Sequence, residues 1–431
     1  MRSAPPLVAP APIRLPGAAE LASLVTILAV LVLFLVSPKV LQWIGLPYAT
    51  SGGSALAKFH PATFLSLLAL MLWALAIGPG RLLARSAVLR PGLVAFAFAI
   101  LLLSFQVIAV QKLPVSAIAD TFVLPLALFV SLTALQRSAN RRLATTLHIL
   151  FFANSAIGYF EYFTGLRLTP YFQGNEIITY DWRSTALFGH PLSNALLTGA
   201  YLLVLSGPAG RRFDTPLRAF LIVFNLGAMA GFGGRAATVV VLALLALRGI
   251  VALLSAVAGR RFARRDLVTI AVAATLLGTF GTLIVMSGFL DSFLDRFQND
   301  HGSAGTRIAM FHVFDGGTWF DFIFAPDLTH IMANQQRLGL SIAIESFVVA
   351  FVAYYGLATT VLFFAGLAAF SGEILRATSA AALLPLGYYF AVSSTSTGIA
   401  NKSIDFAMLM VMLLILLGPA SAAQSRERAP C

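Results

Sequence analysis

The sequence is poor in charge and almost free of cysteine. Charged residues make up 11% of its 431 residues, and Cys431 is the single cysteine. A soluble globular protein carries about 25% charged residues, which cover its outer surface. One cysteine forms neither an intramolecular disulfide nor a thiolate metal site. These deficits exclude an ordinary soluble domain and a disulfide-rich secreted domain.

Apolar residues are abundant instead. They make up 59% of the chain, and the mean hydropathy is +0.88. A membrane-spanning helix needs about 20 apolar residues. We therefore predict one all-α, polytopic integral membrane domain over residues 1–431, with about 12 transmembrane helices. The first apolar run lacks a convincing cleavage site and is expected to be an uncleaved anchor. The predicted spans are 20–37, 62–78, 92–110, 116–135, 144–163, 191–207, 219–233, 236–257, 267–289, 342–370, 379–395 and 404–419. The seventh is short, and the tenth is long enough to begin outside the bilayer.

The net charge of +12 comes largely from arginines grouped in short loops. These groups are separated by helical hairpins, so they fall on one side of the membrane. Such a pattern is typical of cytoplasmic loops and not of a nucleic-acid interface. Both termini are then cytoplasmic. The groups are Arg81, Arg85 and Arg90; Arg137, Arg141 and Arg142; Arg211, Arg212 and Arg218; and Arg260, Arg261, Arg264 and Arg265.

Two connections on the opposite side are long. They cover residues 164–190 and 290–341. Long loops in a compact protein are usually functional or disordered. The second contains many aromatic residues, which argue against disorder. We expect it to form short helices on the outer face.

Several ionisable residues fall near the outer ends of the predicted helices. For Asp120, Glu161 and Asp405 a position at the lipid headgroups is a sufficient explanation. Arg183 and Arg235 are different. Arg183 precedes a Gly-x-Pro element that starts a helix, and Arg235 follows Gly233 and Gly234 at the start of another. A guanidinium at a helix N-terminus is suited to an anion, and two of them on one face suggest a diphosphate ligand.

These motifs resemble those of the O-antigen ligase and Wzy polymerase superfamily. The resemblance covers about residues 180–360. It rests on Arg-x-x-x-Leu-Phe-Gly-x-Pro from Arg183, on Gly-Gly-Arg-Ala from Gly233, and on a large outer loop. The Gly-His-Pro-Leu-x-Asn form is most similar to the exopolysaccharide branch called VpsF-like. Glu345 stands where the family has a histidine, and Gly356 keeps the family's spacing of eleven residues.

The resemblance implies a polysaccharide polymerase with the fold of lipid-sugar-dependent membrane glycosyltransferases. Such an enzyme transfers a glycan from undecaprenyl diphosphate to a hydroxyl of a second lipid-linked repeat unit. No metal or cofactor is implied. The partners would be the lipid-linked oligosaccharide, membrane lipid and a chain-length regulator protein. The candidate catalytic residues are Glu345, Arg235, Arg183 and His330. The candidate substrate-binding residues are Arg307, His190, Asn194, Gly234 and Arg337.

The roles of these residues follow from the chemistry of the leaving group. A lipid diphosphate gains charge as it departs, and arginines can stabilise that charge without a metal. Glu345, in a partly desolvated site, is the first candidate base and His330 the second. Glu345 could equally hold Arg307 or Arg235 in place.

Two other functions are compatible with the sequence. An O-antigen ligase uses the same donor and transfers the glycan to lipid A core, and the donor motifs do not separate it from a polymerase. A lipid-linked glycan transporter or flippase is the alternative from a different class. It should show charged or broken helices near the midplane and a two-fold repeat. Arg248 is the only basic residue predicted within a span.

Overall fold

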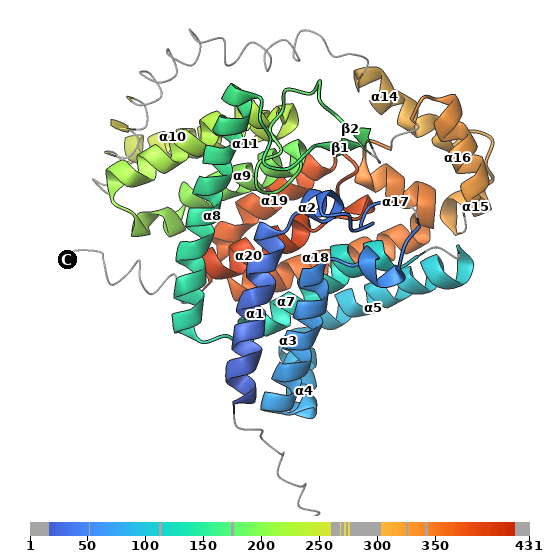
Figure 1. Cartoon of the computed structure of the whole chain (residues 1–431), viewed down its shortest axis with the longest axis horizontal. Coiled ribbons are helices and arrows are strands. Elements are labelled where there is room, and N and C mark those ends of the chain that lie inside the picture. The colour runs from blue at the N-terminus through green and yellow to red at the C-terminus, as the bar shows by residue number, and fades with distance from the viewer. Residues whose placement is uncertain are drawn as a thin grey trace, which may run out of the picture.

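The computed structural model describes residues 17–50, 52–111, 114–173, 176–259, 303–324, 326–340 and 344–418, together with the isolated residues 268, 271–272 and 275. The described part is a helical bundle with a small two-stranded sheet (Figure 1). The N-terminal helices are α1 (Ala18–Leu35), α2 (Pro38–Trp43), η1 (Ala55–Lys58), α3 (Pro61–Ile77), α4 (Pro79–Leu89), α5 (Pro91–Phe105), η2 (Gln106–Val110), α6 (Ser116–Ile118), η3 (Ala119–Val123), α7 (Leu124–Ala134) and α8 (Arg137–Thr164).

The second half begins with a hairpin of two short antiparallel strands, β1 (Phe172–Gln173) and β2 (Glu176–Ile177). It is a small exception to the all-α prediction. The following helices are α9 (Pro191–Leu205), η4 (Pro208–Arg212), α10 (Thr215–Phe232), α11 (Arg235–Val257), α14 (Ser303–Ala309), η5 (Met310–Phe314), α15 (Trp319–Ile323), α16 (Leu328–Arg337), α17 (Phe347–Tyr355), α18 (Leu357–Ala377), η6 (Ala380–Ala382), α19 (Leu383–Ser393), η7 (Gly398–Ala400) and α20 (Asp405–Leu417).

Seven helices in the described part are long and apolar enough to cross a membrane. The pair α3 and α4, bent by 109°, raises this number to eight if it counts as one span. Three further apolar helices are shorter than a usual span: α9, η6 with α19, and α20. Each of these elements falls on one of the twelve predicted spans. The ninth predicted span, 267–289, lies almost wholly outside the described residues.

The short apolar helices form the centre of the bundle. Nearly every side chain of α9 and α20 is buried. Longer helical segments, such as α1, α5 with η2, and α11, surround them and expose large apolar side chains, for example Phe98 and Leu254. A helix that is apolar on its outward face requires an apolar solvent or a partner. This arrangement is typical of a helical multi-pass membrane protein.

The tenth predicted helix, 342–370, is wrong as a continuous element. It is divided at Gly356 into α17 and α18, and α18 extends to Ala377. Gly356 has a φ of 78°, a conformation that costs other residues energy. A side chain at this position would also approach the carbonyl oxygen of Ile323 to 2.8 Å. The segment from 303 to 340 therefore packs against this break.

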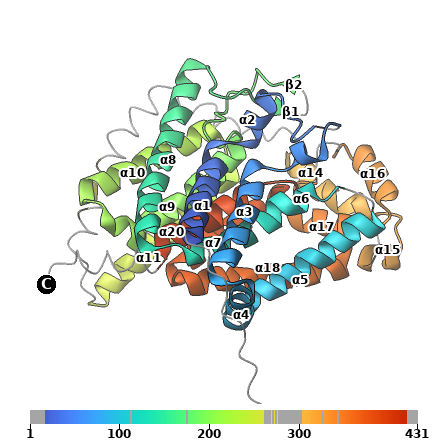
Figure 2. The same ribbon diagram turned by 60° about the horizontal axis from the view of Figure 1, so that its bottom comes forward.

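The short helices expected in the loop 290–341 are present in its described part, 303–324 and 326–340. Helices α14, α15 and α16 lie on the opposite side of the molecule from α8 and α10 in both views (Figures 1 and 2).

Arg248, the basic residue predicted within a span, binds backbone carbonyls at one end of the bundle, which we call the basic end. Its Nη1 donates to the carbonyl of Leu203 (2.9 Å), and Arg218 Nε donates to that of Leu205 (3.0 Å). Both cations thus bind carbonyls at the C-terminus of α9, where the helix dipole favours positive charge. Arg248 therefore lies level with the C-terminal end of α9, as Arg218 does, although it falls near the middle of α11.

Candidate functional site

The opposite end of the bundle carries a layer of buried and half-buried polar groups, which we call the buried polar layer. We use this name for Asp120, Lys402, Glu161, Asp181, Arg183, His190, Asn194 and Asp405 with their hydrogen-bond partners. It joins the starts of α3, η3, α9 and α20 and the end of α8 to the loop segments 165–173 and 176–190. Its hydrogen bonds decide which of its groups remain available to a ligand.

Asp120 is fully buried, so the expected position at the lipid headgroups is wrong. Its carboxylate accepts hydrogen bonds from Tyr48 Oη (2.9 Å), the backbone nitrogen of His60 (3.0 Å) and Thr63 Oγ1 (2.6 Å). Lys402 Nζ lies 3.6 Å away and 3.3 Å from the centre of the Tyr48 ring. Each oxygen of Asp120 is therefore bound within the protein.

Glu161 and Asp405 are likewise bound to the chain rather than placed at headgroups. Glu161 accepts from the backbone nitrogens of Leu168 (2.7 Å) and Ala186 (2.8 Å), which fixes the two ends of the loop. Asp405 accepts from Ser193 Oγ at 2.8 Å. Buried polar groups need such partners to offset their lost hydration.

Arg183 lies in this loop beside the turn that carries Arg235. Ser184 donates its backbone hydrogen to the carbonyl of Gly231 (3.0 Å). Gly233 has a φ of 66°, and a side chain there would lie 2.7 Å from Arg183 Cδ. The structure thus brings the two predicted arginine segments together at the N-terminus of α11.

The guanidinium of Arg183 is held by Asp181. Nε and Nη2 donate to the carboxylate, with a shortest distance of 2.5 Å. Burial opposes ionisation of Asp181, but the hydrogen bonds and charge of Arg183 lower its pKa below the usual value. Nη1 of Arg183 has no hydrogen-bond partner among the described residues. One edge of the guanidinium is oriented and the other can take a ligand.

Gly234 and Asn194 place α11 against α9. A side chain at Gly234 would clash with Ala195, so glycine allows this close approach. Asn194 is buried and donates to the carbonyl of Thr185 (2.5 Å), while its Oδ1 has no partner among the described residues. Both predicted ligand residues therefore shape the layer around Arg183 and Arg235.

His190 is the N-cap of α9. Its Nδ1 accepts from the backbone nitrogen of Leu192 (3.2 Å), and its ring packs edge-on against Tyr171. Burial, and then the charges of Lys39 and Arg183, lower the pKa of His190 to about 3. A neutral imidazole is required for this cap, because a protonated Nδ1 accepts no hydrogen bond.

The remaining candidates lie on the 303–345 segment. Glu345 approaches Arg307 to 3.7 Å, and their side chains are 42% and 45% exposed. Glu345 is therefore half-exposed and lies beside a guanidinium. Of its two predicted roles, this geometry favours the one in which Glu345 holds Arg307. Arg337 is exposed in the last turn of α16.

His330 lies on the same segment but lines a separate cavity. Its Nε2 donates to the carbonyl of Asp315 (2.8 Å), an atom that can only accept. The sequence interpretation missed this cavity of about 420 Å³, whose lining includes Trp319 and Asp327. The run of aromatic residues was its only signal in the sequence. The described residues contain no cluster of three or more His, Cys, Asp or Glu that could hold a metal ion.

Comparison with models of known protein families finds none that matches the chain. Comparison with curated proteins finds no significant match either.

Proposed function

We propose that this protein is a membrane glycosyltransferase that uses a polyprenyl-diphosphate-linked glycan as donor. The observation that carries the proposal is the contact between Arg183 and the Gly233–Arg235 turn. Arg183 meets the turn that leads into Arg235, the first residue of α11, a helix of 23 residues. Backbone N–H groups and guanidinium groups together favour a phosphate ligand.

The reaction joins two glycans. The oxygen of an acceptor hydroxyl bonds to the anomeric carbon of the donor. The bond from that carbon to the diphosphate breaks, and its electron pair stays on the diphosphate. The hydroxyl proton passes to water or to a nearby carboxylate. Arg183 and Arg235 stabilise the charge that develops on the leaving group, a contribution of about 100- to 1000-fold per preorganised donor in other enzymes.

The acceptor in the proposal is a second lipid-linked repeat unit, which makes the protein a polysaccharide polymerase. The order of motifs described above supports this choice. In this proposal the reaction takes place at the outer face of the bacterial inner membrane. A ligase shares the donor half of the site and differs only in the acceptor.

The distribution of polar groups along the bundle also supports a transferase over a transporter. Arg218 and Arg248 bind the C-terminus of α9 at one end of the bundle, and the buried polar layer occupies the other. Alternating access instead places polar groups near the midplane.

The proposal is tested in cells that make the polymer. Substitution Arg183→Ala or Arg235→Ala should cause single lipid-linked repeat units to accumulate, as seen by mass spectrometry of extracted lipids. Arg81→Ala, an exposed arginine of α4 at the other end of the bundle, is the matched control and should leave polymer length unchanged. Normal polymer in both test variants would overturn the proposal.

A further inference from the structure

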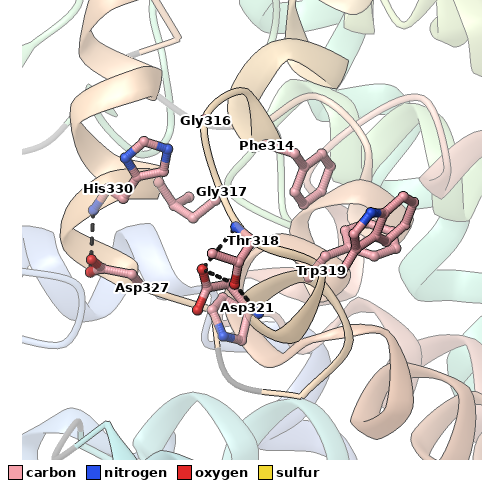
Figure 3. A pocket seen from close by; sticks show the side chains of 11 residues that line it. Phe314, Gly316, Gly317, Thr318, Trp319, Asp321, Asp327 and His330 are labelled. Atoms are coloured by element: carbon pink, nitrogen blue, oxygen red, sulfur yellow. Dashed lines mark hydrogen bonds between the residues drawn. The ribbon is translucent and has the colours of Figure 1, made fainter.

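The cavity beside α15 and α16 is built unlike the arginine site. Its lining residues are Phe314, Gly316, Gly317, Thr318, Trp319, Asp321, Phe322, Pro326, Asp327, His330 and Ile331. We call this the loop pocket. Figure 3 shows Asp327 and His330 on one side, Trp319 and Phe314 on the other, and Asp321 between them. Its volume of about 420 Å³ lies within the range of small-ligand sites.

Three polar side chains of the loop pocket keep hydrogen-bonding capacity that the described part of the chain does not use. Asp321 binds Thr318 through Oδ2, and Asp327 caps α16 through Oδ1. The second carboxylate oxygen of each has no partner among the described residues. His330 uses Nε2, which leaves Nδ1 as an acceptor. These three free atoms are all acceptors, so they fit a ligand rich in hydroxyl donors.

The aromatic side chains supply the other half of a recognition surface. Trp319 is 80% exposed although it belongs to a helix that packs on the rest of the protein. The rings of Phe322 and Trp319 meet edge to face with centroids 6.1 Å apart. Exposed rigid rings offer a large apolar contact area at low conformational cost. The C–H face of a pyranose ring matches such a surface.

The negative charge of the loop pocket favours neutral glycans over anionic ones. Lysine and arginine are absent from its lining residues, whereas two carboxylates are present. A phosphate, a uronic acid or an anionic lipid headgroup would meet like charge there. We propose that the loop pocket binds neutral hexose units of a glycan, with their hydroxyls on Asp321, Asp327 and His330 and a ring face on Trp319. Its assignment to the acceptor glycan rests on the proposed transferase function, and its binding of sugar does not.

Direct binding tests the proposal without any transfer reaction. The purified full chain in detergent is titrated with cellotriose, maltotriose and lactose, and with cellobiouronic acid as the anionic counterpart. Saturation-transfer NMR gives the affinities. At least one neutral sugar should bind, and at least 10-fold more tightly than cellobiouronic acid.

Three variants locate the site. Trp319→Ala should weaken binding of the neutral sugar at least 10-fold. Phe320→Ala removes a neighbouring ring that is 65% exposed but does not line the loop pocket, so it should leave binding within 2-fold of the parent. Asp327→Asn keeps the helix cap and should weaken binding, because Asn is an equally good N-cap but a poorer acceptor for sugar hydroxyls.

The outcomes separate the two proposals. Arg183→Ala should bind neutral sugar as the parent does. Sugar binding that depends on Trp319 would uphold the loop pocket even if the protein transferred no glycan. Absence of binding for every neutral sugar, or equal loss in Trp319→Ala and Phe320→Ala, would overturn the inference even if transfer activity were present.

Discussion

The two polar regions of this molecule differ in how their hydrogen-bonding groups are used. In the buried polar layer, Asp120 and Glu161 bind several donors of the chain itself. In the loop pocket, Asp321 and Asp327 each keep one oxygen without a partner among the described residues. Carboxylates thus stabilise the fold in one region and remain available to a ligand in the other. Within the buried polar layer, Nη1 of Arg183 and Oδ1 of Asn194 are comparable atoms without a partner among the described residues, and Nη1 is the one that carries a donor for an anion.

The largest expected effect is on transfer, through the arginines. Arg183→Ala or Arg235→Ala should lower the rate of glycan transfer about 100- to 1000-fold, because each removes a cation from the leaving group. Rates are measured with purified protein and a lipid-linked donor. The stability of Arg183→Ala is measured in parallel. If loss of folded protein accounts for the lower rate, Arg183 stabilises the fold as its neighbours do, and it does not act on the leaving group.

The next effect is on stability and compares the change from Asp to Asn at one site in each region. Asp120→Asn should lower the free energy of unfolding by about 3 kcal/mol, because it leaves Lys402 and three donors around a buried site without their charge partner. Asp327→Asn should change it by under about 0.5 kcal/mol, since the side chain is exposed and its cap is kept. Unfolding in detergent is followed by circular dichroism. Equal losses in the two variants would contradict the distinction between the regions.

His190 provides a pH test of burial within the layer. Its pKa is about 3 in the folded chain and about 6.5 when exposed. Between these values the unfolded state binds more protons, so stability falls as the pH drops below 6.5 and is unaffected above it. From pH 7 to pH 5 the parent should lose about 1 to 2 kcal/mol more than His190→Asn, which retains a cap. Parallel pH curves for the two proteins would show that the imidazole is not buried neutral.

Glu345 should give the smallest effect. If it holds Arg307, Glu345→Gln lowers transfer less than 10-fold, since the amide still contacts the guanidinium. Arg307→Ala should have a similar effect, and the double variant should be no worse than either single one. A general base contributes about 100-fold or more. A loss of that size in Glu345→Gln alone would restore the base role.

The long apolar helices could be predicted from the sequence because a membrane span is a local property of about 20 residues. The positions of α9 and α20 at the centre could not, since hydropathy does not distinguish a lipid-facing helix from a buried one. The Gly-Gly-Arg turn was recognisable from the sequence, whereas its contact with Arg183 depends on tertiary packing.

The pairing of Asp120 with Lys402 was beyond the sequence, because it joins residues far apart in the chain through tertiary packing. The break at Gly356 was missed for a similar reason. A single glycine in an apolar run is tolerated in a helix, and the packing of Ile323 against it decides the conformation. The aromatic run in the long loop indicated order, but which rings face a cavity depends on how α15 and α16 fold back on each other.

The most direct test of the central claim is transfer by the purified chain in vesicles supplied with one defined polyprenyl-diphosphate-linked repeat unit. Products are separated and their masses measured. We predict glycans of two or more repeats together with free polyprenyl diphosphate, and their loss in Arg183→Ala. Recovery of the repeat unit unchanged, or its movement across the bilayer without a new glycosidic bond, would contradict this prediction.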